Sequence, residues 1–261
     1  MVLRSPRLSF SSGALVFPGG KVDPDDALHD RREAAAPLPE RESELPLRVA
    51  AVREIFEETC VLLARERRSG ALITPERASR LESRYRRAVH NGEIGIAEMA
   101  LAEGLVLAVD LLVPFARWIT PAHSPRRFDA HFFAAACPSG QVPVHDGIEA
   151  VDSVWLSPRQ ALADAAAGRR PILFPTRANL SKLGRHARVA DALADSYPVT
   201  PVSSRVVQTA DGPVLRIPEG LGFELTEMPA APRQRQVIDA PPQFSRIPPC
   251  PGGGGGTSRS S

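Results

Sequence analysis

The chain has 261 residues, 43% of them hydrophobic, which is enough to bury a substantial core and excludes disorder along the whole chain. The formal net charge is only +2, so composition does not indicate a nucleic-acid-binding protein. The three cysteines lack C-x-x-C spacing, which indicates neither a zinc site nor a disulfide framework, and no stretch approaches a membrane span of about 18 apolar residues. We therefore expect a cytoplasmic protein without a membrane or nucleic-acid partner.

The N-terminal part of the chain is expected to contain a strand, a long loop and a helix. The strand is the apolar segment 14–17, which stops at the turn Pro18-Gly19-Gly20. Segment 23–46 is polar, rich in Pro and Glu and without sustained periodicity, and we predict a surface loop. Leu47 then opens a helix whose buried stripe recurs at helical spacing: Val49, Val52, Phe56, Leu62 and Leu63.

Further along the chain, helices and strands alternate. A second helical region is expected over about 75–107, with breaks near Gly92 and Gly104. Strands are predicted at 116–119, 128–136 and 151–156. An N-cap serine and a first-turn proline predict a helix over 157–167, and another helix is expected over about 177–195. This alternation predicts an α+β fold in which helices cover both faces of a mixed sheet.

These elements divide the chain into three parts. Residues 1–196 form the predicted main domain, which carries a loop insertion at 23–46 and a helical insertion at about 66–107. Residues 197–228 form a C-terminal extension that is expected to contain a hairpin turning at Asp211-Gly212. Residues 229–261 are dominated by Pro, Gly, Ser and Arg and are predicted to be a flexible, disordered tail.

The most informative stretch is Arg53-Glu54-Ile55-Phe56-Glu57-Glu58-Thr59. On a helix, Glu57 and Glu58 lie within roughly 60° and 40° of Glu54, so the three carboxylates share one face. Like charges this close destabilise a helix by a few tenths of a kcal/mol, and a hard cation such as Mg²⁺ or Mn²⁺, which prefers carboxylate oxygen, would offset that repulsion. Taken alone, such a cluster is more often a solvated helix face.

The residues around this cluster suit hydrolysis at phosphorus. Divalent cations polarise phosphoryl oxygens and lower the pKa of a bound water, so that hydroxide is generated in place for in-line attack. We expect Arg53 to orient one of the glutamates by a bidentate pair, the alternative being a direct contact with the diphosphate. Gly19 and Gly20 would let the backbone approach the site where a side chain would block it.

Phe17-Pro18-Gly19-Gly20, followed by the stretch 53–59, resembles the Nudix box, whose pattern is G-x5-E-x7-R-E-U-x-E-E-x-G-U with U aliphatic. The resemblance implies a Nudix hydrolase with an α/β/α sandwich and a mixed sheet, in which the box forms a loop-helix-loop that binds Mg²⁺ or Mn²⁺. It also implies that Glu54, Glu57 and Glu58 ligate the metal, one of them assisting deprotonation of water. The predicted catalytic residues are Arg53, Glu54, Glu57 and Glu58, and the predicted substrate-binding residues are Gly19 and Gly20.

The likeness extends over roughly residues 3–185. The start Ser5-Pro6-Arg7, the long insertion after Gly20, the stretch 118–121 and the stretch 127–133 resemble the subgroup typified by the peroxisomal coenzyme A diphosphatase. In that subgroup the box is split by an insertion and a helical segment follows it. By analogy, coenzyme A or an acyl-CoA is the leading substrate, cut at the diphosphate into phosphopantetheine and adenosine 3′,5′-bisphosphate.

The chain departs from the box pattern in three places. Eight residues before Arg53, where the box has its first glutamate, stands Leu45, with Glu44 beside it. Cys60 replaces the last glycine of the box, and because a cysteine at positive φ costs roughly 1 kcal/mol, we expect a helix end of different build. Met1 lies close to the glycine turn, which leaves little room for a first strand.

Three alternatives stay open. The same chemistry would serve ADP-ribose, a dinucleotide or a nucleoside triphosphate. A non-catalytic Nudix-fold binding module is the second alternative, and the retention of all three box glutamates argues against it. Nucleic-acid binding through the arginines is the third, and the weak net charge argues against it. The expected partner is therefore a nucleotide-like small molecule, and the oligomeric state, a homodimer included, is left open.

Overall fold

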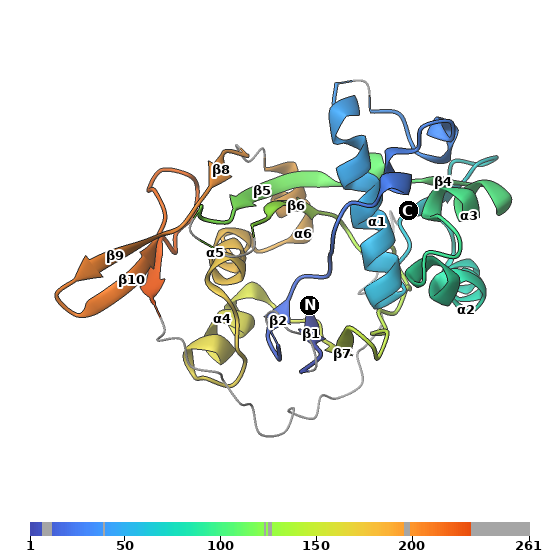
Figure 1. Ribbon diagram of the computed structural model, residues 1–261. Helices are drawn as coiled ribbons and strands as arrows, with labels where there is room; N and C mark the ends of the chain where they lie inside the picture. Colours follow the sequence, from blue (N-terminus) through green and yellow to red (C-terminus); the bar gives the residue numbers. More distant parts are fainter. Residues whose placement is uncertain (7–11, 39, 123, 125–126, 196–198, 231–261) are drawn as a thin grey trace, which may run out of the picture. The chain divides into compact units, whose positions relative to one another are not determined.

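The computed structural model describes residues 1–6, 12–38, 40–122, 124, 127–195 and 199–230 (Figure 1). Arg7 of the N-terminal motif lies outside the described residues, and so does the predicted tail from position 231 on. The chain folds as two compact units. Unit 1 contains residues 1–18, 111–136 and the described chain from 147 on, and unit 2 contains residues 19–110 and 137–146.

Unit 2 is built around one long helix that carries the glutamate cluster. Its elements in chain order are the 3-10 turns η1 (Pro24–Ala27), η2 (Arg32–Ala34) and η3 (Glu42–Glu44), helix α1 (Leu45–Thr59), strand β3 (Ala64–Glu66), helices α2 (Pro75–His90) and α3 (Ile96–Ala102), and strand β4 (Leu105–Leu107). Strands β3 and β4 pair antiparallel. The 3-10 turn η4 (Val109–Leu111) follows β4.

Helix α1 begins at Leu45, two residues before the predicted start. The turn η3 leads directly into it, and Pro46 is accommodated in the first turn, where its missing N–H removes no helical hydrogen bond. Three residues of the predicted stripe are fully buried: Val49, Val52 and Phe56. Leu62 and Leu63 are buried as well, but they follow the helix and do not belong to its stripe.

The insertion 23–46 is folded within unit 2, so the prediction of a plain surface loop is wrong. It forms three 3-10 turns and buries Asp26, Leu28, Ala34, Ala35, Ala36 and Leu38. The backbone N–H of Ala36 donates to the carbonyl of Leu107 (2.9 Å), which attaches the insertion to strand β4. Turns of three residues leave no helical or strand period in a sequence, and this explains why the pattern did not reveal them.

Unit 1 contains three small sheets and three helices among the residues that the structure describes. Its strands are β1 (Val2–Arg4), β2 (Leu15–Val16), β5 (Val113–Ile119), β6 (Asp129–Ala134), β7 (Ala150–Ser153), β8 (Pro201–Val202), β9 (Arg205–Thr209), β10 (Gly212–Arg216) and β11 (Glu227–Pro229). Its helices are α4 (Pro158–Ala166), α5 (Phe174–Leu183) and α6 (Val189–Ala194).

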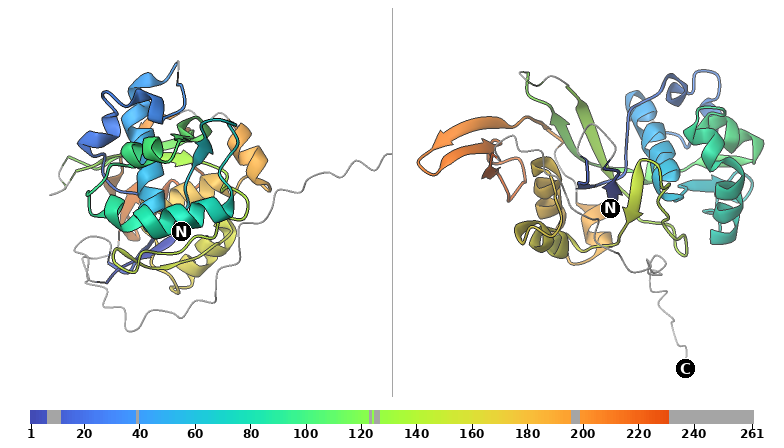
Figure 2. Two further views of the ribbon diagram at one scale, coloured as in Figure 1. Left: turned by 90° about the vertical axis from the view of Figure 1, so that its right-hand side faces the viewer. Right: turned by 60° about the horizontal axis from the view of Figure 1, so that its bottom comes forward.

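The three sheets of unit 1 differ in their pairing. Strand β1 lies between β2 and β7 and is antiparallel to both, so a first strand is present where the sequence left little room for one. Strand β5 pairs antiparallel with β6 and parallel with β8, which makes this sheet mixed. Strands β9, β10 and β11 form an antiparallel sheet. Figures 1 and 2 show β9 and β10 as a hairpin that projects from the rest of unit 1.

An aromatic cluster forms one core of unit 1 and includes the C-terminal extension. The ring of Trp118 packs edge-on against Phe174, with centroids 6.0 Å apart, and against Phe223, with centroids 5.5 Å apart. Ile217 and Phe223, both from the extension, are buried in this cluster. The extension therefore belongs to the folded core. The single helix expected over about 177–195 is broken into α5 and α6 after Gly184, which caps α5.

The structure bears on two features of the composition, the apolar stretches and the cysteines. No helix of the described residues has the length and apolar character that crossing a membrane requires. Cys60 is a free, buried thiol.

Lys182 is a lysine buried in the aromatic core of unit 1. Its side chain is only 1% exposed, and its Nζ donates to the carbonyl oxygen of Phe115 at 2.8 Å. The ammonium also lies over two rings, 4.9 Å from the centroid of Phe115 and 5.0 Å from that of Phe223. Burial, followed by repulsion from Arg185, lowers the pKa of Lys182 to about 8.

The lowered pKa predicts how stability changes with pH. Between about pH 8 and the ordinary lysine value of 10.5, the unfolded chain keeps a proton that folded Lys182 has lost. Unfolding then takes up a proton, so the free energy of unfolding rises with pH across this window. We expect wild type to gain stability relative to Lys182→Met between about pH 8 and pH 10 in urea unfolding. A difference between the two proteins that does not change with pH would contradict the burial of a charged amine.

Candidate metal and active site

The glycine turn approaches the glutamate helix closely. The backbone N–H of Gly19, which has a φ of +151°, donates to Glu58 Oε2 at 3.2 Å, although the two residues are 39 positions apart. At Gly20, an added Cβ would overlap the carboxylate of Glu54. Only a glycine leaves that carboxylate in its place. The expectation that a glycine lets the backbone approach the site closely therefore applies directly at Gly20.

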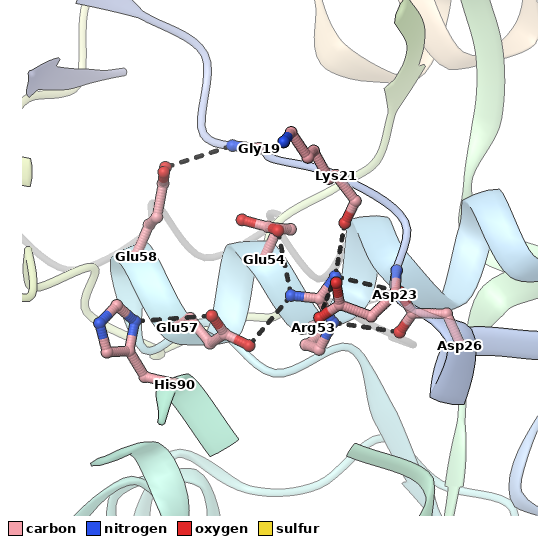
Figure 3. Close-up of polar contacts among 9 residues, drawn as sticks. All are labelled: Gly19, Lys21, Asp23, Asp26, Arg53, Glu54, Glu57, Glu58 and His90. Carbon is pink, nitrogen blue, oxygen red and sulfur yellow. Dashed lines mark hydrogen bonds and ion pairs between the residues drawn. The ribbon is translucent and has the colours of Figure 1, made fainter. Parts of the chain in front are cut away.

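The three box glutamates are withdrawn from solvent but do not all point the same way. Glu57 and Glu58 are buried, at 7% and 6% exposure, and the side chain of Glu54 is 15% exposed. Figure 3 shows Glu54 and Glu58 directed toward the Gly19–Lys21 segment, whereas Glu57 is directed toward His90. A solvated charged face, the ordinary explanation of such a cluster, would leave these side chains exposed.

Arg53 holds two of the glutamates by their side chains. Its Nη1 donates to Glu54 Oε1 at 3.0 Å and to Glu57 Oε1 at 3.2 Å, and its Nη2 donates to the carbonyl of Lys21 at 2.7 Å (Figure 3). The guanidinium therefore connects the glycine turn to the helix. This geometry favours the orienting role for Arg53 over a direct contact with a diphosphate.

Asp26 is the partner of Arg53 that the sequence analysis missed. It is 1% exposed, and its two carboxylate oxygens accept from Arg53 Nε at 3.1 Å and from Nη2 at 3.0 Å. Asp26 stands six positions after Gly20, where the pattern G-x5-E places its first acidic residue. Counting forward from the glycine would have found it, whereas counting back from Arg53 led to Leu45.

Leu45 and Glu44, the positions marked by the backward count, have other roles. Leu45 is buried, at 4% exposure, as the first residue of α1. Glu44 pairs with Arg48 one helical turn later, with Arg48 Nη2 at 2.7 Å from its Oε2. Neither residue contacts Arg53 through a hydrogen bond or ion pair found among the described residues.

The electrostatics of Arg53 follow from its burial among anions. Burial by itself would lower the pKa of the guanidinium, but the hydrogen bonds and charge of Asp26, followed by the charges of Glu54 and Glu57, raise it above its ordinary value. Arg53 therefore stays charged at any physiological pH. Because the pair with Asp26 is desolvated, removing either partner would leave a buried charge without its main counter-ion.

Cys60 ends helix α1 in the way that a glycine would, so the expectation of a differently built helix end is wrong. Its φ is +64° and its N–H donates to the carbonyl of Phe56 at 2.9 Å. The thiol contacts Glu82 Oε1 at 3.1 Å and the carbonyl of Val144 at 3.2 Å. Burial, and then the contact with Glu82, raises the pKa of Cys60 to about 12. These contacts offset the cost of the left-handed conformation, roughly 1 kcal/mol.

Helix α2 adds Arg86 and His90 to the site. The Nε of Arg86 donates to the backbone carbonyl of Glu57 at 2.8 Å. The Nδ1 of His90 lies 3.6 Å from Glu57 Oε2 (Figure 3). Both residues come from the helical insertion, and the sequence gives no sign of where a basic residue on that helix will point.

The donor set of the site fits a hard divalent cation. It consists of three carboxylates between positions 54 and 58 of one helix, and oxygen donors of this kind are those that Mg²⁺ and Mn²⁺ prefer. Across the described ranges, no three His, Cys, Asp or Glu side chains already stand together as a metal cluster. Instead Glu54 and Glu57 share the guanidinium of Arg53, Glu57 also lies beside His90, and Glu58 accepts from the N–H of Gly19. The positive charge of Arg53 and the N–H of Gly19 reduce the repulsion among the three anions.

Comparison with known protein families and curated sequences gives matches over most of the chain. The family described as the NUDT19 Nudix domain matches residues 28–175, which is more than half of the chain. The putative nudix hydrolase 7 of Caenorhabditis elegans is 27% identical over 186 residues, covering 71% of this chain and 55% of that protein. The acyl-coenzyme A diphosphatase NUDT19 of Xenopus laevis is 23% identical over 229 residues, covering 72% of this chain and 60% of that protein.

A solved structure resembles this chain as well. The crystal structure of a NUDIX hydrolase from Alicyclobacillus acidocaldarius is 29% identical in sequence and superposes with a TM-score of 0.60, covering 76% of this chain and 88% of that chain. The fold is therefore the Nudix fold, here an α+β structure with several small sheets. The chain spans 55% and 60% of the lengths of the two curated relatives.

The buried pair of Arg53 and Asp26 predicts a large effect of a small change. Asp26→Asn keeps the shape of the side chain but removes the main counter-charge of Arg53, and we expect the free energy of unfolding to fall by about 3 kcal/mol. Asp25→Asn, which removes the same charge from an exposed neighbour, should change it by less than about 0.5 kcal/mol. Urea unfolding measures both, and equal effects of the two substitutions would contradict the importance of the buried pair.

Proposed function

The chain belongs to the Nudix hydrolase family, in the group of the NUDT19 Nudix domain, and on this basis we propose that it cleaves the diphosphate linkage of a nucleoside-diphosphate-X substrate. Coenzyme A or an acyl-CoA is the proposed substrate. The observation that carries the proposal is the close approach of the glycine turn to the box helix, where Gly19 N–H meets Glu58 and Gly20 leaves room for Glu54.

In the proposed reaction the residues of α1 bind the metal and accept a proton. A hard divalent cation, Mg²⁺ or Mn²⁺, supplies positive charge that polarises a phosphoryl oxygen and makes a nearby water more acidic. Glu54, Glu57 and Glu58 would hold the cation, and one of their carboxylates would accept the proton of the attacking water. Arg53 keeps Glu54 and Glu57 oriented, which reduces the reorganisation that the transition state requires.

The glycine turn has a separate part in the proposed reaction. Without side chains, Gly19 and Gly20 let the backbone lie against the carboxylates, and the same open backbone would admit the diphosphate of the substrate. The orienting contacts of Arg53 with Lys21 and with Glu54 keep the turn and the helix together. Substrate binding at the turn and proton transfer at the helix would therefore take place at adjoining positions.

The name of one relative supports the substrate. The Xenopus laevis protein to which this chain is 23% identical is an acyl-coenzyme A diphosphatase, and coenzyme A contains the diphosphate linkage that Nudix chemistry requires. Hydrolysis there would give phosphopantetheine and adenosine 3′,5′-bisphosphate. ADP-ribose, dinucleotides and nucleoside triphosphates carry the same linkage and are the alternative substrates. A non-catalytic binding module is less well supported, because a binder does not need three partly desolvated carboxylates.

The remaining expectations from the sequence form part of the same proposal. We propose the α/β/α sandwich with a mixed sheet that the family resemblance implies, and a cytoplasmic location. No nucleic-acid partner is proposed, because the net charge of the chain is only +2. A homodimer would be recognised by the mass of the protein in solution, measured by light scattering.

A substrate screen tests the proposed activity. We expect the purified protein to hydrolyse coenzyme A or an acyl-CoA faster than ADP-ribose, dinucleotides and nucleoside triphosphates, in Mg²⁺ or in Mn²⁺ and not in excess chelator. Chromatographic identification of phosphopantetheine and adenosine 3′,5′-bisphosphate is the measurement. Faster turnover of ADP-ribose would move the assignment to another Nudix substrate, and no turnover of any diphosphate would favour the binding module.

The metal-binding glutamates give a second prediction. Glu57→Gln and Glu58→Gln each remove a negative oxygen donor, and we expect kcat to fall by about 100-fold or more in each case. Glu98→Gln, which changes an exposed glutamate on α3, should keep wild-type activity. Circular dichroism checks that all three variants are folded. Undiminished turnover in both Glu57→Gln and Glu58→Gln would remove the assignment of the metal site.

A further inference from the structure

The last turn of helix α2 contacts the helix that carries the glutamates. Two basic residues at this point are directed at Glu57, one at its backbone and one at its carboxylate. Arg86 Nε donates to the Glu57 carbonyl at 2.8 Å, and its Nη2 donates to the carbonyl of Val144 at 2.8 Å. Because Arg86 binds two carbonyl groups at once, the last turn of α2 is fixed against the end of α1, and His90 is fixed with it.

The carboxylate of Glu57 is held from two sides. Arg53 Nη1 donates to Oε1 at 3.2 Å, and His90 Nδ1 lies 3.6 Å from Oε2 (Figure 3). The side chain of Glu57 is 9% exposed, so the neighbouring protein groups restrict it more than bulk water does. A glutamate loses side-chain entropy when it is ordered, and neighbours on both sides of the carboxylate order it in advance of metal binding.

Near the end of α2, Arg86 binds the backbone of Glu57, whereas the carboxylate of Glu57 is faced by His90. The side chain of His90 is 23% exposed and comes from the partly buried side of the helix, whereas Arg87 in the same turn is exposed. The Nδ1 of His90 faces Glu57 Oε2, so a small shift of either side chain brings the imidazole within hydrogen-bond distance of the carboxylate. Contacts of this kind between a ligand and a second residue set the orientation of metal ligands in proteins.

We propose that His90 is a positioning residue for Glu57, contributed by the helical insertion. It fixes the carboxylate from the side opposite Arg53, so that Glu57 is oriented before the divalent cation binds. The proposal rests on the proposed function, because it concerns the same metal site. It gives the helical insertion a role in the chemistry, since α2 then determines the direction of one ligand.

The test compares three variants for Mn²⁺ binding and for turnover. His90→Leu removes the donor and keeps a side chain of similar reach, His90→Gln restores a donor, and Arg87→Gln is the matched control on the exposed side of α2. Isothermal titration gives the Mn²⁺ dissociation constant directly. Steady-state kinetics with the best substrate of the screen gives kcat and KM, and thermal unfolding without metal reports on folding.

We expect His90→Leu to weaken Mn²⁺ binding by about 10-fold and to lower kcat by a similar factor, with KM within about two-fold of wild type. His90→Gln should recover most of both losses, and Arg87→Gln should match wild type. Unchanged Mn²⁺ affinity in a folded His90→Leu variant would overturn the role of His90 and leave the proposed function intact. A wild-type protein that neither binds Mn²⁺ nor hydrolyses a diphosphate would contradict both proposals.

Discussion

The site depends on one buried ion pair, that between Arg53 and Asp26. A guanidinium at 7% exposure requires a counter-ion that is itself desolvated, and Asp26 supplies one with two hydrogen bonds. The same guanidinium then has its Nη1 directed at Glu54 and Glu57. The position of the carboxylates on α1 thus depends on a residue in the insertion, so the insertion has to fold for the box helix to present its ligands correctly.

Two insertions support the box helix. The turns of segment 23–46 provide Asp26 and attach to strand β4, and helix α2 provides Arg86 and His90 at the end of α1. A split box is therefore compatible with an ordered site, because each piece of added chain returns to the helix. The long separation of Gly20 from Arg53 costs little in itself, since the entropy of closing a loop grows only slowly with its length.

The sequence was sufficient for the box, the glycine turn and the approximate order of helices and strands, because these have local signatures. It was insufficient where the position of a side chain depends on residues that are distant in the sequence. Asp26 was missed because the insertion moves it far from Arg53, and the direction of Glu57 depends on His90 from another helix. The left-handed Cys60 was unexpected because its contacts with Glu82 and Val144 form only in the folded protein. Turns of three residues in the insertion leave no period to detect.

Whether the carboxylates of α1 gather around a divalent cation is best measured by anomalous diffraction from crystals of this protein soaked in Mn²⁺. In the structure, Glu54 and Glu57 share Arg53, and Glu58 accepts from the N–H of Gly19. We predict an anomalous peak coordinated by Glu54, Glu57 and Glu58, with Arg53 still paired to Asp26. Mn²⁺ found only at other places, or no peak beside α1 at a saturating concentration, would contradict the metal site.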